Sequence, residues 1–337
     1  MTQMTAFGRA LMTLAATTIA LPALADDPAA VTHWLDEAKI AAGDRYLPVQ
    51  QHLCYLHSPD DENRVAERRE RAQIKPTRVF DDLYYLGIDE VASWGLASSA
   101  GIILFDALNN AKEASEVIAA GASKLGLDPR QIKYVVLTHG HGDHFGGAQF
   151  LKSHYGAKVL AAPADWAVMG KWEEMAASGR VPANWNAPPA HDQDIADRQT
   201  LTLGDSSVQF FLTPGHTPGT VSSIFTVTDK GKKHVVAQWG GIGLPTNREA
   251  LDAYLGSLDA FEKVAASAGA DVILTNHPHA DMSLEWVSQI GHGHSDPNPL
   301  VVGPNGVKQW FSVVRDCALA QQARLVAGVP PMGRGAR

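Results

Sequence analysis

Residues 139–144 read His-Gly-His-Gly-Asp-His and directly follow the apolar run Tyr134-Val135-Val136-Leu137. The run predicts a buried strand, 132–137, that ends in a tight loop. In such a loop the first two histidines can point one way, while the aspartate and the last histidine turn toward a second point. Imidazole nitrogen and carboxylate oxygen are ligands that zinc prefers. The cluster therefore predicts a metal site, with a solvated histidine-rich turn as the alternative.

Two further histidines occupy similar places along the chain. His216 lies in the segment Thr-Pro-Gly-His-Thr-Pro-Gly, 213–219, after a predicted strand at 208–212. His277 follows another predicted strand, 272–274. A lone histidine after a strand is commonly a surface or core residue. Because all three groups follow buried strands, we expect their side chains to converge at the carboxyl ends of those strands.

The three motifs in this order resemble those of the metallo-β-lactamase superfamily, over about residues 79–290. The resemblance implies an α/β fold with four layers, an αββα sandwich built as a single domain, and a site for two zinc ions. It also implies two sets of zinc ligands: His139, His141 and His216 for one ion, and Asp143, His144 and His277 for the other.

The chain departs from many superfamily hydrolases after the 213–219 turn. Those enzymes carry a metal-bridging acid or a cysteine ligand on the next strand, where residues 235–241 here read Val-Val-Ala-Gln-Trp-Gly-Gly. This difference weakens a similarity to glyoxalase II or to lactonases, and it favours subclass B3 β-lactamases, whose second zinc uses Asp-His-His. Gln238 and Trp239 are candidates to line the pocket, with simple packing as the alternative for the tryptophan. Asp106 resembles the acid that family members place behind the metal ligands, although a turn-capping role explains it equally well.

The resemblance implies a hydrolase in which a metal-bound hydroxide attacks a carbonyl carbon and Asp143, the expected catalytic residue, orients it. The first hypothesis is a secreted or periplasmic dinuclear-zinc enzyme that cleaves an amide or lactam bond of a small-molecule substrate. A lactonase or esterase of the same superfamily is the alternative. A catalytically silent metal-binding protein and an iron-dependent oxygenase are the other hypotheses.

Several other histidines have less defined roles. His279 lies close to a predicted ligand, and His292 and His294 form a glycine-flanked pair before Asp296, so either an extra metal site or a polar loop would explain them. No spacing assigns the remaining ones: His33, His52, His57, His154, His191 and His234.

The first 25 residues predict a secretory signal peptide. Arg9 precedes an apolar run at 10–21, and Ala23-Leu24-Ala25 gives a cleavage site after Ala25. The run is too short to span a bilayer, and a buried helix is the alternative. In an oxidising compartment Cys54 and Cys317 are expected to form a disulfide, with two separate buried thiols as the alternative.

Composition indicates a globular protein: of 337 residues, 45% are hydrophobic and 19% charged. The formal charge is −8, and loss of the single leader arginine leaves −9. No basic cluster indicates nucleic acid, because the arginines of 64–71 alternate with glutamates. No later segment is apolar for long enough to cross a membrane, and nothing indicates an oligomeric state.

The pattern of elements divides the mature chain into a helical lead-in, 26–76, a main domain, 77–327, and a disordered tail, 328–337. A long surface loop is expected at 171–189, at the mouth of the pocket. The remaining elements are predicted from periodicity and from turn residues. The predicted strands are 79–80, 83–86, 94–97, 101–105, 159–162, 201–203, 222–227 and 235–237, and the helices are 111–125, 146–155, 251–264 and 306–325.

Overall fold

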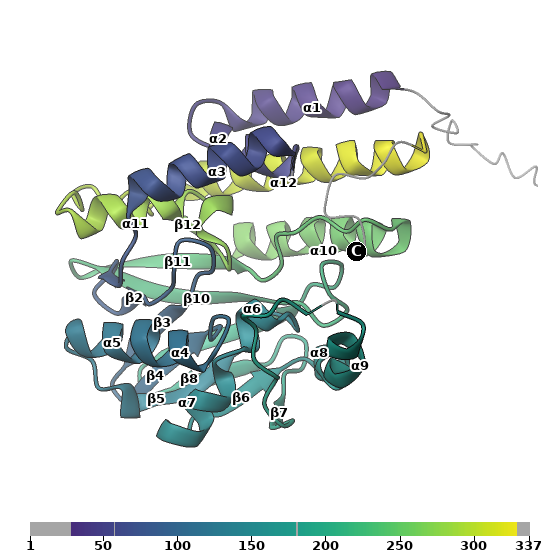
Figure 1. The fold of residues 1–337 in the computed structure, drawn as a ribbon. Helices are drawn as coiled ribbons and strands as arrows, with labels where there is room; N and C mark the ends of the chain where they lie inside the picture. Colours follow the sequence, from purple (N-terminus) through teal and green to yellow (C-terminus); the bar gives the residue numbers. More distant parts are fainter. Residues whose placement is uncertain (1–27, 57, 180, 329–337) are drawn as a thin grey trace, which may run out of the picture.

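Two β-sheets lie face to face, and helices cover both outer faces (Figure 1). The computed structural model describes residues 28–56, 58–179 and 181–328. The predicted signal peptide and nearly all of the predicted tail lie outside these residues. The four layers confirm the expected αββα sandwich.

The first sheet has seven strands in sequence order. The neighbours from β1 to β4 are antiparallel, and those from β4 to β7 are parallel. Its strands are β1 (Thr77–Arg78), β2 (Leu83–Tyr85), β3 (Trp94–Ser98), β4 (Gly101–Phe105), β5 (Ile132–Val136), β6 (Lys158–Ala161) and β7 (Gln193–Asp194).

The second sheet has five strands in the order β12-β11-β10-β9-β8, and only β11 and β12 run parallel. The β10–β11 hairpin turns at Lys230 and Gly231, which both have positive φ, as a tight hairpin turn requires. Its strands are β8 (Thr200–Leu203), β9 (Ser206–Leu212), β10 (Val221–Asp229), β11 (Lys232–Trp239) and β12 (Val272–Thr275).

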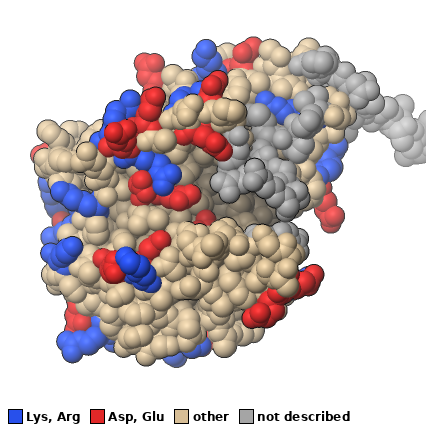
Figure 2. Space-filling model, viewed as in Figure 1, with Lys and Arg blue, Asp and Glu red and all other residues tan. Residues whose placement is uncertain are grey.

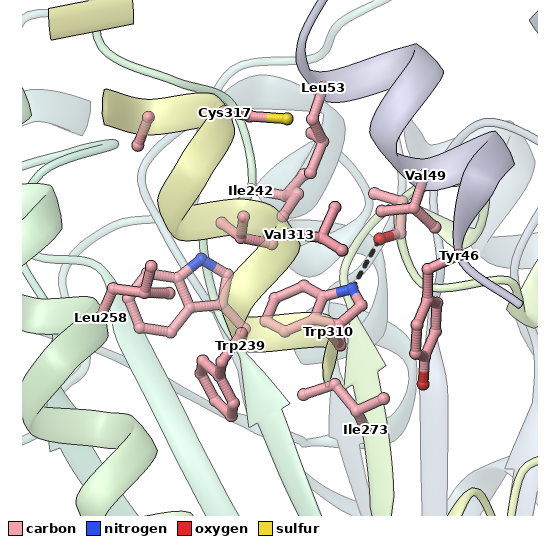
Figure 3. Close-up of a cluster of buried hydrophobic side chains, with 14 of the residues drawn as sticks. Tyr46, Val49, Leu53, Trp239, Ile242, Leu258, Ile273, Trp310, Val313 and Cys317 are labelled. Carbon is pink, nitrogen blue, oxygen red and sulfur yellow. Dashed lines mark hydrogen bonds between the residues drawn. The ribbon is translucent and has the colours of Figure 1, made fainter. Parts of the chain in front are cut away.

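Helices α4 (Ala111–Glu113), α5 (Ala120–Lys124) and α7 (Ala148–Tyr155) cover the first sheet, while α10 (Arg248–Ser267) and α12 (Gly303–Val326) cover the second (Figure 1). The other helical segments are α6 (Gly142–Phe145), α8 (Pro163–Met169), α9 (Trp172–Ala177), α11 (Ser283–Gly291), η1 (Ala114–Ala119), η2 (Pro129–Gln131) and η3 (Pro278–Ala280). Apolar side chains fill the space between the sheets and the space under each helical layer. Figure 3 shows the layer under α12, where Trp310 and Trp239 are fully buried.

The predicted lead-in consists of three helices, α1 (Pro28–Ala42), α2 (Leu47–Leu53) and α3 (Pro59–Ala72). Helix α1 lies along α12, so the two ends of the described chain are side by side (Figure 1). A disulfide joins Cys54 to Cys317, as predicted. The arginine-rich run is only partly a solvated surface, because Arg68 is buried and pairs with Glu285 at 2.6 Å.

Three expectations on the elements need correction. The single helix expected at 111–125 is α4, a π-helical η1 and α5 in succession. The expected loop at 171–189 begins with helix α9, because alanines and glutamates favour a helix before the prolines begin. The strand expected at 79–80 lies two residues earlier, as β1.

On the face shown in Figure 2, basic and acidic side chains are interspersed. Among the described residues, no helix has the length and apolar character needed to cross a membrane.

Candidate metal centre

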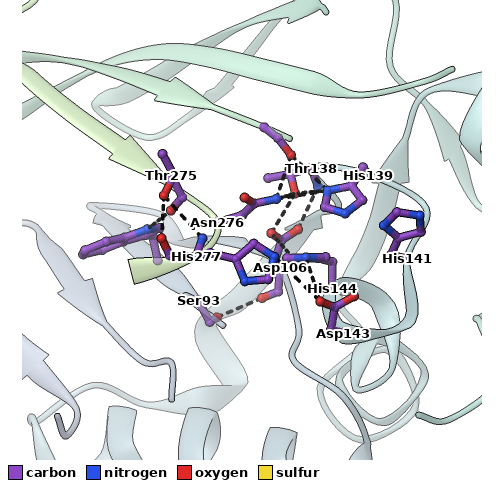
Figure 4. Close-up of polar contacts among 12 residues, drawn as sticks. Ser93, Asp106, Thr138, His139, His141, Asp143, His144, Thr275, Asn276 and His277 are labelled. Carbon is purple, nitrogen blue, oxygen red and sulfur yellow. Dashed lines mark hydrogen bonds and ion pairs between the residues drawn. The ribbon is translucent and has the colours of Figure 1, made fainter. Parts of the chain in front are cut away.

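The three histidine-bearing segments meet at one edge of the two sheets. Strand β5 leads to the cluster at 139–144, β9 leads to His216, and β12 leads to His277. Gly215 permits the turn before His216: its φ is +146°, and a Cβ there would lie 2.5 Å from the backbone of Tyr254. Figure 4 shows most of the predicted ligands close together. The convergence expected from the sequence is therefore present in the fold.

Backbone carbonyls fix the protonation pattern of three of these imidazoles. The Nδ1 atoms lie 2.8–3.0 Å from carbonyl oxygens, in the pairs His139–Gly240, His216–Gly243 and His277–Glu90. Because a carbonyl oxygen only accepts, each Nδ1 carries the proton and donates it. Each Nε2 is therefore left with an unshared electron pair.

Two of these electron pairs, on His139 and His216, converge with a ring nitrogen of His141. His216 Nε2 lies 3.1 Å from His139 Nε2 and 3.2 Å from His141 Nδ1. Such atoms repel one another unless a cation lies between them. Zinc with nitrogen ligands at about 2.0–2.1 Å in a tetrahedron separates those nitrogens by about 3.3 Å. The donor set and its spacing therefore fit zinc.

The second predicted set lies beside the first. Asp143 Oδ2 is 3.4 Å from His144 Nε2 and 3.8 Å from His277 Nε2. Asp143 Oδ1 and His144 Nε2 are buried atoms without a hydrogen-bond partner among the described residues. The most compact second group combines Asp143 and His144 with His139, while His277 lies slightly farther out. Unpartnered buried oxygen and nitrogen atoms that can offer an electron pair fit a second cation.

Asp106 directly supports the second set. Its carboxylate accepts hydrogen bonds from the Nδ1–H of His144 at 2.8 Å and from the backbone N–H and hydroxyl of Thr138 at 2.7 and 2.8 Å (Figure 4). The residue holds a positive φ of 62° at the end of β4. It therefore orients His144, and its carboxylate bonds the loop after β5 rather than its own turn, which favours the supporting role over turn capping.

Burial and neighbouring charges set the ionisation of the cluster. Burial lowers the pKa of His216 to about 3 and that of His277 to about 4, which keeps both rings neutral, as a metal ligand must be. Burial would lower the pKa of His144 as well, but Asp143 and Asp106 raise it to about 10. Burial would raise the pKa of Asp143, but His144 lowers it well below its usual value. A cation would thus displace a proton from His144.

Asp165, which the sequence did not single out, links two of the histidine segments. This fully buried carboxylate accepts hydrogen bonds from Gly140 N–H at 2.7 Å, Gly219 N–H at 2.8 Å and the Thr217 hydroxyl at 2.7 Å. It lies in the first turn of α8, after β6. The sequence did offer one signal for Asp165: it is a carboxylate that follows β6, the parallel neighbour of β5. Neighbouring parallel strands end at the same edge of a sheet, so Asp165 could be expected near the histidine cluster.

A pocket of about 530 Å³ opens over the predicted ligands. Its apolar lining includes Trp185 from the predicted mouth loop and Ile242. Trp185 packs so closely on Gly142 that a Cβ there would lie 2.4 Å from the indole ring. Trp239 does not line this pocket but packs against Tyr254 in the core, and Gln238 is buried with no hydrogen-bond partner for its amide among the described residues.

The other histidines differ in where they lie. His52 and His279 line the pocket, although no spacing in the sequence had assigned His52. His292 and His294 are exposed and belong to neither group of described residues that could hold a metal, which favours the polar loop. His154, His191 and His234 bond to nearby backbone or carboxylate groups, His33 packs on Trp34, and His57 lies outside the described residues.

Comparisons with known proteins agree with this geometry. A family model described as the metallo-β-lactamase superfamily matches residues 87–237. Among solved structures, BJP-1, a subclass B3 metallo-β-lactamase of Bradyrhizobium japonicum, is 26% identical, with a TM-score of 0.56 over 72% of this chain and 91% of that chain. The chain belongs to the metallo-β-lactamase superfamily.

Curated relatives match a shorter part of the chain. A hydroxyacylglutathione hydrolase of Acidiphilium cryptum is 29% identical over 133 residues, 40% of this chain and 44% of its own length. The N-acyl homoserine lactonase AttM of Azorhizobium caulinodans is 25% identical over 177 residues, 49% of this chain and 65% of its own length. The chain thus spans roughly half the length of the curated relatives that it matches.

Proposed function

We propose that this protein is a zinc-dependent hydrolase with two ions per chain. One ion would be held by His139, His141 and His216, and the other by Asp143, His144 and His277. The observation that carries the proposal is the convergence of three ring nitrogens: His139 Nε2 and His141 Nδ1 lie 3.1 and 3.2 Å from His216 Nε2. The unpartnered atoms of Asp143 and His144 support the second ion.

Zinc at these positions supplies a water of lowered pKa and polarises the carbonyl oxygen of a substrate. Asp143 is the catalytic residue among the side chains, because its unpartnered Oδ1 can accept a hydrogen bond from the attacking water and orient it. Asp106 keeps His144 in position through the Nδ1 bond. Trp185 and Ile242 limit access of bulk water to the reacting carbonyl.

An amide or lactam bond is the first candidate for cleavage. The likeness to a subclass B3 β-lactamase extends over 91% of that enzyme, which supports lactam hydrolysis more than the shorter matches support other bonds. A lactone or another ester is the second candidate, because the lactonase AttM aligns with 49% of this chain. Both reactions use the same attack on a carbonyl carbon.

The experiment is to measure bound metal and then the turnover of a chromogenic cephalosporin, a γ-lactone and an aryl ester. Two zinc ions per chain and fastest turnover of the cephalosporin support the first candidate. Two zinc ions with turnover of the lactone alone support the second. Bound zinc without turnover of any substrate supports a silent metal-binding protein, and bound iron supports an oxygenase. His154→Ala, at an exposed position on α7, is the control for loss of an imidazole.

We further infer that the protein acts outside the cytoplasm. The Cys54–Cys317 disulfide supports an oxidising compartment, and the pattern around Arg9 and Ala25 supports cleavage of a leader. Cell fractionation with N-terminal sequencing tests this inference. The expected mature protein begins at Asp26 and is found in the periplasm or the medium. A full-length cytoplasmic protein would contradict it.

A further inference from the structure

The N-terminal helices contribute directly to the pocket over the predicted metal ligands. His52, near the end of α2, lines that pocket and is 8% exposed. Leu56, just beyond α2, lines it as well. The segment that the sequence presents as a helical lead-in therefore forms one wall of the candidate active site.

A buried carboxylate fixes the proton of His52. The ring Nδ1 lies 3.1 Å from both carboxylate oxygens of Asp61, which is 2% exposed and lies in the first turn of α3. Because the carboxylate accepts, Nδ1 carries the proton and donates it. In the neutral ring the unshared electron pair is therefore on Nε2, for which no hydrogen-bond partner exists among the described residues.

His279 holds this ring in place from the other side. The two imidazoles pack edge to face, with centroids 4.5 Å apart, and the His277 ring lies 5.5 Å from His279. Arg68 donates from Nη1 to the carbonyl oxygen of His279 at 3.1 Å, which ties this loop to α3. His52 thus lies two ring contacts from a predicted zinc ligand and is fixed on both of its flanks.

We propose that His52 is a specificity residue whose Nε2 accepts a hydrogen bond from a donor on the substrate, an amide N–H or a hydroxyl, outside the scissile bond. The proposal rests on the proposed hydrolase function. Asp61 is the positioning residue, because it sets the tautomer and the ring orientation. The apolar side chains of Leu56 and Trp185 in the same pocket would exclude water and strengthen the bond to the donor.

Two matched substrate pairs test this role. One pair is a chromogenic cephalosporin with an acylamino side chain and its analogue methylated on the amide nitrogen, and the other is a hydroxyl-bearing γ-lactone and its methoxy analogue. His52→Phe keeps a ring without nitrogen, His52→Gln restores an acceptor, and His154→Phe is the remote control. Bound metal and melting temperature are measured for every variant.

For His52→Phe we expect the KM of the donor-bearing substrates to rise about five- to tenfold, the loss of one hydrogen bond. The KM of the methylated partners and the metal content should not change, and His52→Gln should recover part of the loss. Asp61→Asn should give a smaller rise of the same kind. An equal change for both members of a pair, or no change, would overturn the proposal.

If the wild-type protein hydrolyses neither pair, the proposed function fails for these bonds but His52 can still be tested. Calorimetry then compares binding of the four ring-opened acids to the wild-type protein and to His52→Phe. Weaker binding of only the donor-bearing acids to the variant supports the subsite. Equal binding to both proteins, or no binding to the wild type, overturns it.

Discussion

The carboxylate of Asp106 and the imidazole Nδ1 of His144 are 2.8 Å apart, and both side chains are almost completely buried. Their positions come from different strands, since Asp106 directly follows β4 and His144 follows β5. The pair therefore connects the geometry of the first sheet to the orientation of His144 Nε2, the atom that this ring presents to the site.

Asp106→Asn preserves the size of this side chain but removes one acceptor oxygen and the negative charge. We expect a 10- to 100-fold loss in affinity for the second zinc, with the first zinc retained. Titration of the metal-free protein with zinc, followed by calorimetry, measures both affinities. Equal affinities in the variant and the wild type would show that Asp106 does not orient His144.

His277→Ala removes one predicted ligand of the second ion. The expected metal content falls from about two ions per chain to about one, and kcat/KM falls by at least the 10- to 100-fold that loss of a supporting residue causes. Elemental analysis of the purified variant gives the stoichiometry. His292→Ala, at an exposed histidine, is the control. Unchanged stoichiometry would remove His277 from the ligand set.

The two carboxylate oxygens of Asp165 accept three hydrogen bonds. Asp165→Asn replaces one of these oxygens with an NH2 group, which cannot accept. At least one donor among Gly140 N–H, Gly219 N–H and the Thr217 hydroxyl loses its partner. We expect the free energy of unfolding to fall by about 1–3 kcal/mol. Denaturant unfolding measures this loss, with the exposed Asp194→Asn as control. A variant as stable as the wild type would indicate that these loops hold their shape without the carboxylate.

The disulfide connects residues 263 positions apart in the chain. Cutting so long a loop should lower the free energy of unfolding by about 3–5 kcal/mol. The double variant Cys54→Ser/Cys317→Ser and the wild type under a reducing agent should therefore melt at the same reduced temperature. A wild-type melting temperature that does not respond to the reductant would contradict the expectation.

Partial burial raises the pKa of Asp316 to about 6, and Glu37 acts in the same direction. The folded state thus binds this proton more tightly than the unfolded state does. The resulting stabilisation is complete below about pH 4 and is lost as the pH rises through about 6. Asp316→Asn should therefore melt about 1–3 °C above the wild type at pH 8 and show no such gain at pH 4.

Melting curves of both proteins from pH 4 to pH 8 measure the difference. Asp36→Asn, at an exposed position on α1, is the control and should give no pH-dependent gain. A gain for Asp316→Asn that is constant across this range would exclude ionisation of Asp316 as its cause.

The sequence was most informative where chemistry is encoded by local spacing. The cluster at 139–144, the turn around His216 and the strand before His277 each predict a ligand from a few neighbouring residues, and the fold brings them together. Buried strands could also be predicted from the sequence, because β4 and β5 are short apolar runs bounded by turn residues. The disulfide was predicted from two cysteines in a chain with a secretory leader pattern, although two separate thiols remained an alternative until the fold was known.

Contacts between segments far apart in the chain could not be predicted from the sequence. His52 and Asp61 have ordinary sequence neighbours, and the place of His52 at the pocket depends on how α2 and α3 pack against the rest of the fold. Asp165 supports the site through backbone N–H groups, which every residue except proline carries, so only its place after the strand next to β5 could have indicated it. The helix α9 was missed because the tryptophans and prolines of the region masked a short run of good helix formers.

The bond between Cys54 and Cys317 also affects when the site can be completed. His52 is synthesised early, two residues before the first cysteine, whereas the second cysteine emerges only near the end of synthesis. The segment that carries His52 is therefore among the first to be synthesised, but its disulfide can form only after nearly the whole chain has been made. A chain that ends before α12 contains every predicted zinc ligand, but it lacks Cys317, so no disulfide holds the pocket wall that carries His52.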